Sequence, residues 1–225
     1  MKTRNAIKSL LPLLTLIIAA SLIAGCASHN YQKGAATSAS LTDSADKIAA
    51  GKYKIEATLS ALNDLVNSPQ GDLVTKFKNY NDAVADLQST AQNVKARVQD
   101  TRASGNEYFK AWDEQLALIK NEDLRNRSAE RKTEVQKEFT DIKRVYAQTE
   151  MAFKPFLADL KDIQTALGTD LTTGGIASVK STADKANQDA VALKISVDQL
   201  VTQFKALGVA MAAYSPAPQS VPGGQ

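Results

Sequence analysis

The chain has 225 residues, of which 44% are hydrophobic and 23% charged, with 11 Gly, 6 Pro, one Cys and one His. This composition excludes a collagen-like chain, a disulfide scaffold and a wholly disordered chain. One Cys and one His also leave no cluster of thiolates and imidazoles for zinc. The formal net charge is +3, but residues 1–25 hold three basic residues and no acid, so the remainder balances 24 basic against 24 acidic side chains. A nucleic-acid-binding face needs a basic excess, so we expect no nucleic-acid partner.

The first 25 residues have the features of a secretory signal peptide. A positive segment comes first and an apolar run from Leu10 to Ala20 follows, with small residues after it. The apolar run is too short for a comfortable membrane span, and this order of segments is typical of a signal peptide. The basic residues are Lys2, Arg4 and Lys8.

The segment Leu22-Ile23-Ala24-Gly25-Cys26 resembles the lipobox of bacterial lipoproteins. The resemblance implies cleavage after Gly25, a diacylglycerol thioether on Cys26 and acylation of the new amine, which together give stable membrane anchoring. Ala27 stands where Asp would favour the inner membrane, so we expect an outer-membrane anchor that faces the periplasm. The alternatives are an ordinary signal peptide with an incidental cysteine, or a buried apolar helix.

Residues 26–40 are expected to form the lipidated cysteine and a flexible, soluble tether, because they are rich in Ala, Ser and Thr. From Leu41 onward, apolar residues recur at alternating spacings of four and three. This pattern predicts long, supercoiled helices. Ser68 and Pro69 are expected to cap and open the second helix, and the acids after Asn121 suit the start of the third. The apolar runs cover residues 41–66, 73–119, 135–167 and 176–214.

Four such segments predict an all-α, elongated, antiparallel up-down-up-down four-helix bundle over residues 41–214. Pro155 should bend the third helix, and the Pro/Gly-rich residues 215–225 should be disordered. The first helix is shorter than the second, so we expect a two-helix hairpin around residues 105–135 to project from the bundle. Alternating helix directions place this hairpin at the same end as the anchor.

The sequence offers no catalytic constellation, metal site or cofactor site, and we expect a protein that is not an enzyme. The one histidine, His29, lies in the expected tether without a nucleophile partner, and no predicted helix carries the His ligands that haem or di-iron sites need. Six residues of the projecting hairpin are candidates for a contact surface. Their rings alternatively belong to the core, and their arginines either pair with nearby acids or meet lipid headgroups. These residues are Tyr108, Phe109, Trp112, Arg125, Arg127 and Arg131.

The body of the chain contains the short motifs Phe109-x-x-Trp112-x-Glu114-x-Leu116, Leu124-Arg125-x-x-Ser128, Tyr146, Glu150, Pro155-x-Leu157 and Ile176-Ala177-Ser178. These motifs resemble a family of helical periplasmic bacterial lipoproteins known only as a domain of unknown function. The resemblance covers most of residues 50–205, implies no activity or site, and differs at Phe153 and Phe156, where we expect Met and Val.

We consider two functions for this chain. The first is a non-catalytic, lipid-anchored envelope scaffold or adaptor with a protein partner. The second is a periplasmic binding or chaperone-like module for lipid or unfolded outer-membrane cargo. An apolar cavity within the bundle would favour the second.

Overall fold

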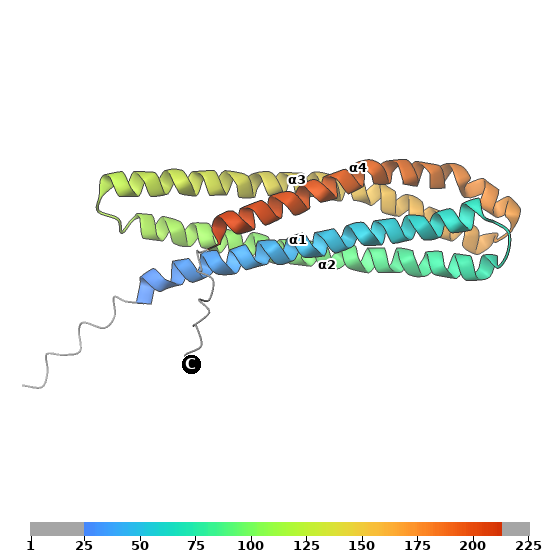
Figure 1. Ribbon diagram of the computed structural model, residues 1–225, viewed down its shortest axis with the longest axis horizontal. Helices are drawn as coiled ribbons and strands as arrows, with labels where there is room; N and C mark the ends of the chain where they lie inside the picture. Colours follow the sequence, from blue (N-terminus) through green and yellow to red (C-terminus); the bar gives the residue numbers. More distant parts are fainter. Residues whose placement is uncertain (1–24, 213–225) are drawn as a thin grey trace, which may run out of the picture.

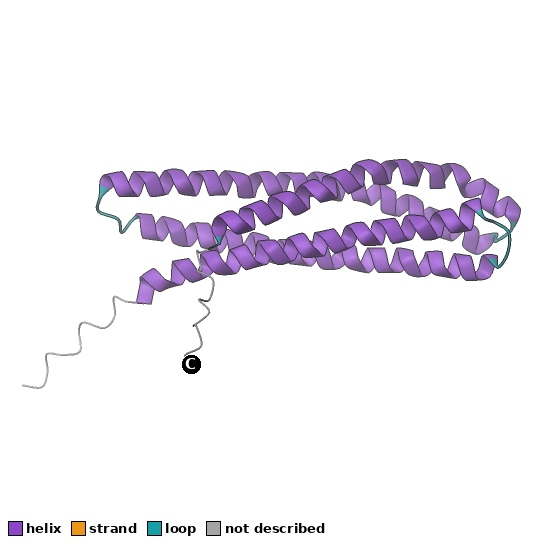
Figure 2. Ribbon diagram, viewed as in Figure 1, coloured by secondary structure: helices purple, strands orange, loops and turns teal. Residues whose placement is uncertain are grey.

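A computed structural model describes residues 25–212 of the chain. These residues form four long helices that run alternately up and down in an elongated bundle (Figures 1 and 2), and the described part contains no strand. The predicted all-α, four-helix bundle is therefore confirmed. None of the described helices combines the length and the apolarity needed to cross a membrane. The helices are α1 (Gly25–Asn67), α2 (Leu73–Leu116), α3 (Glu122–Thr169) and α4 (Thr173–Met211).

Polar side chains fix the start of three helices by accepting hydrogen bonds from free backbone N–H groups. At α2 the acceptor is the Asp72 carboxylate, which lies 3.0 Å from the Thr75 nitrogen. The cap expected at Ser68 and Pro69 is therefore wrong. At α3 the Asn121 side chain accepts from Leu124 N at 3.0 Å, with two acids in the first turn, as predicted. Thr172 caps α4 in the same way.

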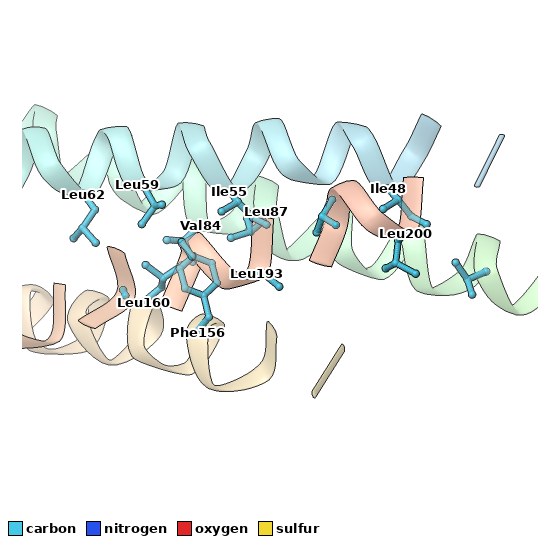
Figure 3. Close-up of a cluster of buried hydrophobic side chains, with 14 of the residues drawn as sticks. Ile48, Ile55, Leu59, Leu62, Val84, Leu87, Phe156, Leu160, Leu193 and Leu200 are labelled. Atoms are coloured by element: carbon cyan, nitrogen blue, oxygen red, sulfur yellow. The ribbon is translucent and has the colours of Figure 1, made fainter. Parts of the chain in front are cut away.

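The core follows the predicted apolar spacing through most of the bundle (Figure 3). Side chains from all four helices meet there and exclude water, which is the main source of stability for such a fold. Tyr80 is also fully buried, and its hydroxyl donates to the Leu160 carbonyl oxygen at 2.8 Å. The most deeply buried large side chains include Leu41, Leu62, Leu65, Leu87, Phe156, Leu160, Ile163, Leu167, Leu193, Leu200 and Leu207.

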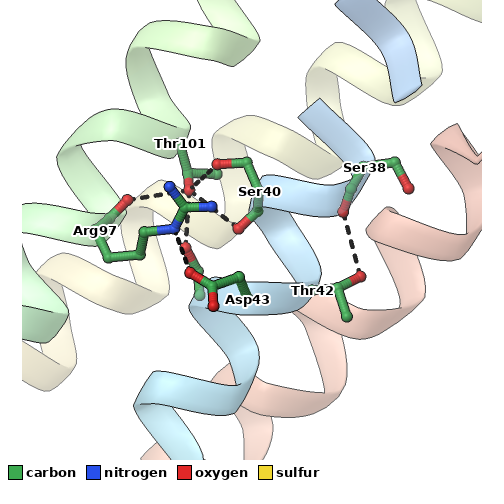
Figure 4. A network of polar contacts seen from close by, with 7 residues as sticks. Ser38, Ser40, Thr42, Asp43, Arg97 and Thr101 are labelled. Atoms are coloured by element: carbon green, nitrogen blue, oxygen red, sulfur yellow. Dashed lines mark hydrogen bonds and ion pairs between the residues drawn. The ribbon is translucent and has the colours of Figure 1, made fainter. Parts of the chain in front are cut away.

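The prediction of a flexible tether over residues 26–40 is wrong, because α1 begins at Gly25 and packs against α2 and α4. The small polar side chains of this segment form the interface (Figure 4). The hydroxyls of Ser40 and Ser44 each lie 2.8 Å from Thr101 Oγ1 on α2. Ser38 donates to the carbonyl oxygen of Gly208 on α4 at 2.6 Å. Residues this small let helix backbones approach closely while their hydroxyls stay hydrogen-bonded.

The start of α1, the α2–α3 turn and the end of α4 lie toward the same end of the molecule, as the alternating directions predict (Figure 1). The α2–α3 hairpin extends beyond the end of α4, but α1 runs beside it. A Cβ on Gly34 of α1 would lie 3.1 Å from the Tyr108 ring of α2. The expected lone two-helix projection is therefore covered by α1 as far as Tyr108. Residues 1–24 of the predicted signal peptide and the C-terminal tail at 215–225 lie outside the described residues.

Candidate functional site

The residues of the expected lipid anchor lie at the beginning of the first helix. Gly25 and Cys26 belong to the first turn of α1, and His29 follows in the next turn. The helix therefore continues directly from the position where the lipid is expected. Lipidation of Cys26 and cleavage after Gly25 stay predictions.

The three aromatic candidates of the hairpin pack against the bundle core. Phe109 is buried, and its ring stands edge-on to Phe139 of α3 with centroids 5.6 Å apart. Tyr108 lies between Phe109 and Trp112, at 5.5 and 5.4 Å. The Trp112 indole donates to Ser128 Oγ at 3.0 Å. Burial raises the pKa of Tyr108, while the nearby Arg131 acts in the opposite direction. These contacts agree with the alternative that the three rings belong to the core. Contact of the rings with a membrane or a protein partner stays a prediction.

Each of the three candidate arginines has an acidic partner on its own helix. Arg125 lies 3.9 Å from Glu122, Arg127 lies 3.1 Å from Asp123, and Arg131 lies 3.4 Å from Glu134. Such exposed pairs contribute little to stability, and they reduce the positive field at the hairpin. Two leucines near the turn, Leu118 and Leu124, are more than half exposed.

The structure also contains an apolar groove of about 440 Å³ between α2 and α3, at the middle of the bundle. Its volume falls in the range of ligand sites, about 300–1,000 Å³. The floor consists of buried side chains from the other helices and from α2, which appear together in Figure 3. These floor residues include Ile48, Ile55, Leu87, Leu193 and Leu200.

Four residues on the walls of the groove occupy core positions of the apolar pattern but are only partly buried. They are Ala91 and Val94 on α2, and Tyr146 and Phe153 on α3. In a closed bundle these side chains would meet across the seam between the two helices. Here α2 and α3 stand apart, so the seam opens to solvent at this level.

Two residues lie at the level of the opening. Gly51 of α1 faces the groove at the core spacing of Ile48 and Ile55, and a Cβ added to it would meet no atom within 4 Å. A glycine inside a helix costs about 1 kcal/mol relative to alanine, and here the space that a side chain would fill stays empty. Pro155 lies in the α3 segment that lines the groove. Its ring displaces the helix from a straight path, and α3 changes direction along its length (Figure 1).

Polar side chains surround the mouth of the groove. Lys95 of α2 and Lys154 of α3 both approach Glu150, at 3.5 and 3.9 Å. Tyr146 lies at one end of the groove, where burial and the Glu150 carboxylate raise its pKa to about 12 against the opposing effect of Arg102. This arrangement lacks a nucleophile paired with a base, and within residues 25–212 no group of three or more His, Cys, Asp or Glu side chains is placed to hold a metal ion. The arrangement can bind an apolar ligand.

The sequence does not predict the groove, because an apolar spacing pattern does not show how closely two helices approach each other. Two features of the sequence nevertheless mark the part of the bundle where the groove lies. An alternation of four and three from Ile48 to Ile55 puts Lys52 at a core position, but Lys52 pairs with Asp198 at 2.7 Å on the surface and Gly51 faces inward instead. Pro155 predicts a bend in α3, but its place beside the groove depends on the packing of α3.

The fold and this groove define an all-α bundle with an open apolar cleft along one seam. The chain belongs to the family described as "Protein of unknown function (DUF2959)", whose model matches residues 30–207. The match includes residues 30–40, in keeping with their place in the bundle. No curated protein and no solved structure matches the chain.

Proposed function

We propose that the protein is a non-catalytic, lipid-anchored component of the bacterial cell envelope that binds an apolar ligand in the groove between α2 and α3. The groove carries this proposal. A bundle that served only as a spacer would gain stability by closing its seam, since each buried methylene contributes about 0.8 kcal/mol. This seam instead leaves apolar walls partly exposed at Val94, Tyr146 and Phe153.

The anchor supports the same proposal from the sequence. The lipobox resemblance at Leu22–Cys26 implies attachment to a membrane, with the outer membrane and the periplasmic side favoured by Ala27. A membrane-attached protein with an apolar groove lies near a supply of apolar molecules. This proximity favours lipid-derived molecules as the ligands.

A scaffold or adaptor role is the second candidate, and one observation favours it. Leu118 and Leu124 are 67% and 57% exposed beside the α2–α3 turn, where they offer apolar contact to a protein partner. Two exposed leucines alone cover far less than the ~800 Å² that each partner buries in a stable protein interface. The groove is therefore the stronger basis for function.

Binding of a neutral apolar probe tests the proposed function. We expect N-phenyl-1-naphthylamine to gain fluorescence with residues 27–225, a form that contains the whole buried core. Gly51→Leu places a side chain in the groove and should abolish the gain without loss of stability. Ala57→Leu, on an exposed face of α1, is the matched control and should bind as the wild type does. The proposal fails if the wild type gives no gain, or if both variants bind equally.

Metabolic labelling with a palmitate analogue tests the anchor. The full-length chain should incorporate the label and fractionate with membranes, and Cys26→Ser should lose both properties because the thioether cannot form. Continued labelling of Cys26→Ser would disprove the anchor. The groove proposal would survive that result, because the probe experiment does not depend on lipid.

A further inference from the structure

The charges at the mouth of the groove are not balanced. Three lysines line it against one acid, and the neutral amides of Gln88 and Gln92 complete the rim. Glu150 lies within 4 Å of both Lys95 and Lys154, so one carboxylate serves two ammonium groups. The remaining lysine, Lys161, forms no ion pair within the described part of the chain. The residues that line the mouth thus carry an excess of two positive charges, on lysines whose side chains are largely exposed to water.

Two of the three lysines lie on the α3 side of the mouth together with Glu150, and Lys95 lies on the α2 side. Lys154 and Lys161 are two turns apart on α3, about 10 Å along the helix. The contacts Tyr80–Leu160 and Lys95–Glu150 fix the register of α2 and α3 and place Gln88 across the groove from this pair. A negatively charged group at the mouth would therefore meet ammonium groups on one side and amide N–H donors on the other. Such charge-assisted hydrogen bonds are stronger than those between neutral groups.

The dimensions of the groove fit a single hydrocarbon chain. Its α3 wall runs from Tyr146 to Lys161, about 22 Å at 1.5 Å per residue. One acyl chain occupies about half of the ~30 Å hydrocarbon core of a bilayer. The volume of about 440 Å³ is close to three times that of a ~150 Å³ cavity that holds one benzene molecule. One alkyl chain fits this space, whereas the two chains of a phospholipid do not.

Resting on the function proposed above, we infer that the ligand is an anionic amphiphile with one alkyl chain, such as a long-chain fatty acid. Its chain lies along the floor at Leu87, Leu193 and Leu200. Its carboxylate lies at the mouth beside Lys154 and Lys161.

A comparison of an acid with its ester tests the headgroup assignment on residues 27–225. The probe is cis-parinaric acid, a fluorescent long-chain fatty acid, set against its neutral methyl ester below micelle-forming concentrations. The wild type should bind the acid about fivefold or more tightly than the ester, from two exposed charge contacts of modest strength. Lys154→Gln with Lys161→Gln should bring the affinity for the acid down to that for the ester. The ester and N-phenyl-1-naphthylamine should bind this variant unchanged.

The matched control is Lys120→Gln with Lys137→Gln, which removes the same net charge at exposed positions remote from the groove. It should keep the preference for the acid. Equal binding of acid and ester by the wild type, or an unchanged preference in the Lys154/Lys161 variant, would overturn the headgroup assignment. Displacement of the probe as readily by a two-chain phosphatidylglycerol as by its single-chain lyso form would overturn the single-chain assignment. In these cases the groove function stands if the naphthylamine probe still binds. Failure of that probe would overturn the function itself.

Discussion

At the scale of single residues, two helix-interior glycines have opposite surroundings. Gly105 of α2 is buried, and a Cβ there would overlap the ring of Phe139 on α3. That ring is itself held edge-on by Phe109. Gly51 of α1 faces open space in the groove. Glycine is thus required for close packing at one position and leaves room at the other.

Alanine at each glycine should therefore change the free energy of unfolding in opposite directions. We expect Gly105→Ala to destabilise by about 1–3 kcal/mol, because Phe139 must move within a packed core. Gly51→Ala should stabilise by about 0.5–1 kcal/mol, because alanine favours the helix and meets no neighbour. Urea denaturation of the two variants measures both effects. Changes of the same sign would contradict the assigned surroundings.

Tyr80 makes stability depend on alkaline pH. Burial raises the pKa of its hydroxyl above the ordinary value near 10. The folded chain therefore holds this proton more tightly than the unfolded chain, so the contribution is complete below about pH 10 and declines as the pH rises further. Tyr80→Phe removes the hydrogen bond to Leu160 and should cost about 0.5–1.5 kcal/mol at neutral pH.

The variant should also lose less stability than the wild type above pH 10, in denaturation curves measured across that range. Tyr53→Phe is the control, since Tyr53 is 70% exposed and should change neither quantity. An equally steep alkaline decline in Tyr80→Phe would show that another group is responsible. Tyr146, whose pKa burial and Glu150 raise to about 12, would be the first to examine.

At the scale of elements, apolar spacing predicts four helices and most of the core, because a long repeat of four and three has few other structural solutions. The start of α3 was predictable from Asn121 and the acids that follow it, because helix capping depends only on residues close together in the sequence. The N-terminal part of α1 was not predictable. Ala, Ser and Thr are typical both of a linker and of closely packed helices, and the contact of Ser38 with Gly208, 170 residues away, distinguishes the two. The groove was not predictable either, since it depends on how far α2 and α3 separate.

Pro155 connects the shape of α3 with the groove. Proline lacks the N–H that the Met151 carbonyl would otherwise accept, and its ring clashes with the preceding turn. We expect Pro155→Ala to raise the free energy of unfolding by about 1–3 kcal/mol, because the helix regains a hydrogen bond. A straighter α3 should lie closer to α2 and bind N-phenyl-1-naphthylamine more weakly.

Pro69→Ala, in the α1–α2 turn, is the matched control and should leave probe binding unchanged. Chemical denaturation and probe titration on the same samples separate the two effects. If Pro155→Ala is more stable but binds the probe as well as the wild type, the opening results from the side chains that line the groove. The bend in α3 would then have no part in it.

At the scale of the whole molecule, the helix order determines how the groove stands relative to the proposed anchor. Cys26 is in the first turn of α1, and Gly51 at the groove comes 25 residues later in the same helix. That separation is about 38 Å at 1.5 Å per residue. Because no linker intervenes, an upright bundle holds the groove clear of the bilayer. A ligand chain must then leave the membrane before it enters the groove, as a carrier or scavenger requires.

Energy transfer from the protein to membrane headgroups tests this orientation. Cys26 is the only cysteine and is consumed by the proposed lipid, so one introduced cysteine provides a unique labelling site. In vesicles with an acceptor dye on the headgroups, a donor at Leu118→Cys, near the α2–α3 turn, should transfer strongly. A donor at Gln70→Cys, in the α1–α2 turn, should transfer weakly, because the 43 residues of α1 span about 65 Å. Cys26→Ser, with either label, should not join the vesicles and should transfer from neither site. Equal transfer from both sites of the lipidated chain would mean that the bundle lies flat, and the groove could then receive its ligand directly from the bilayer surface.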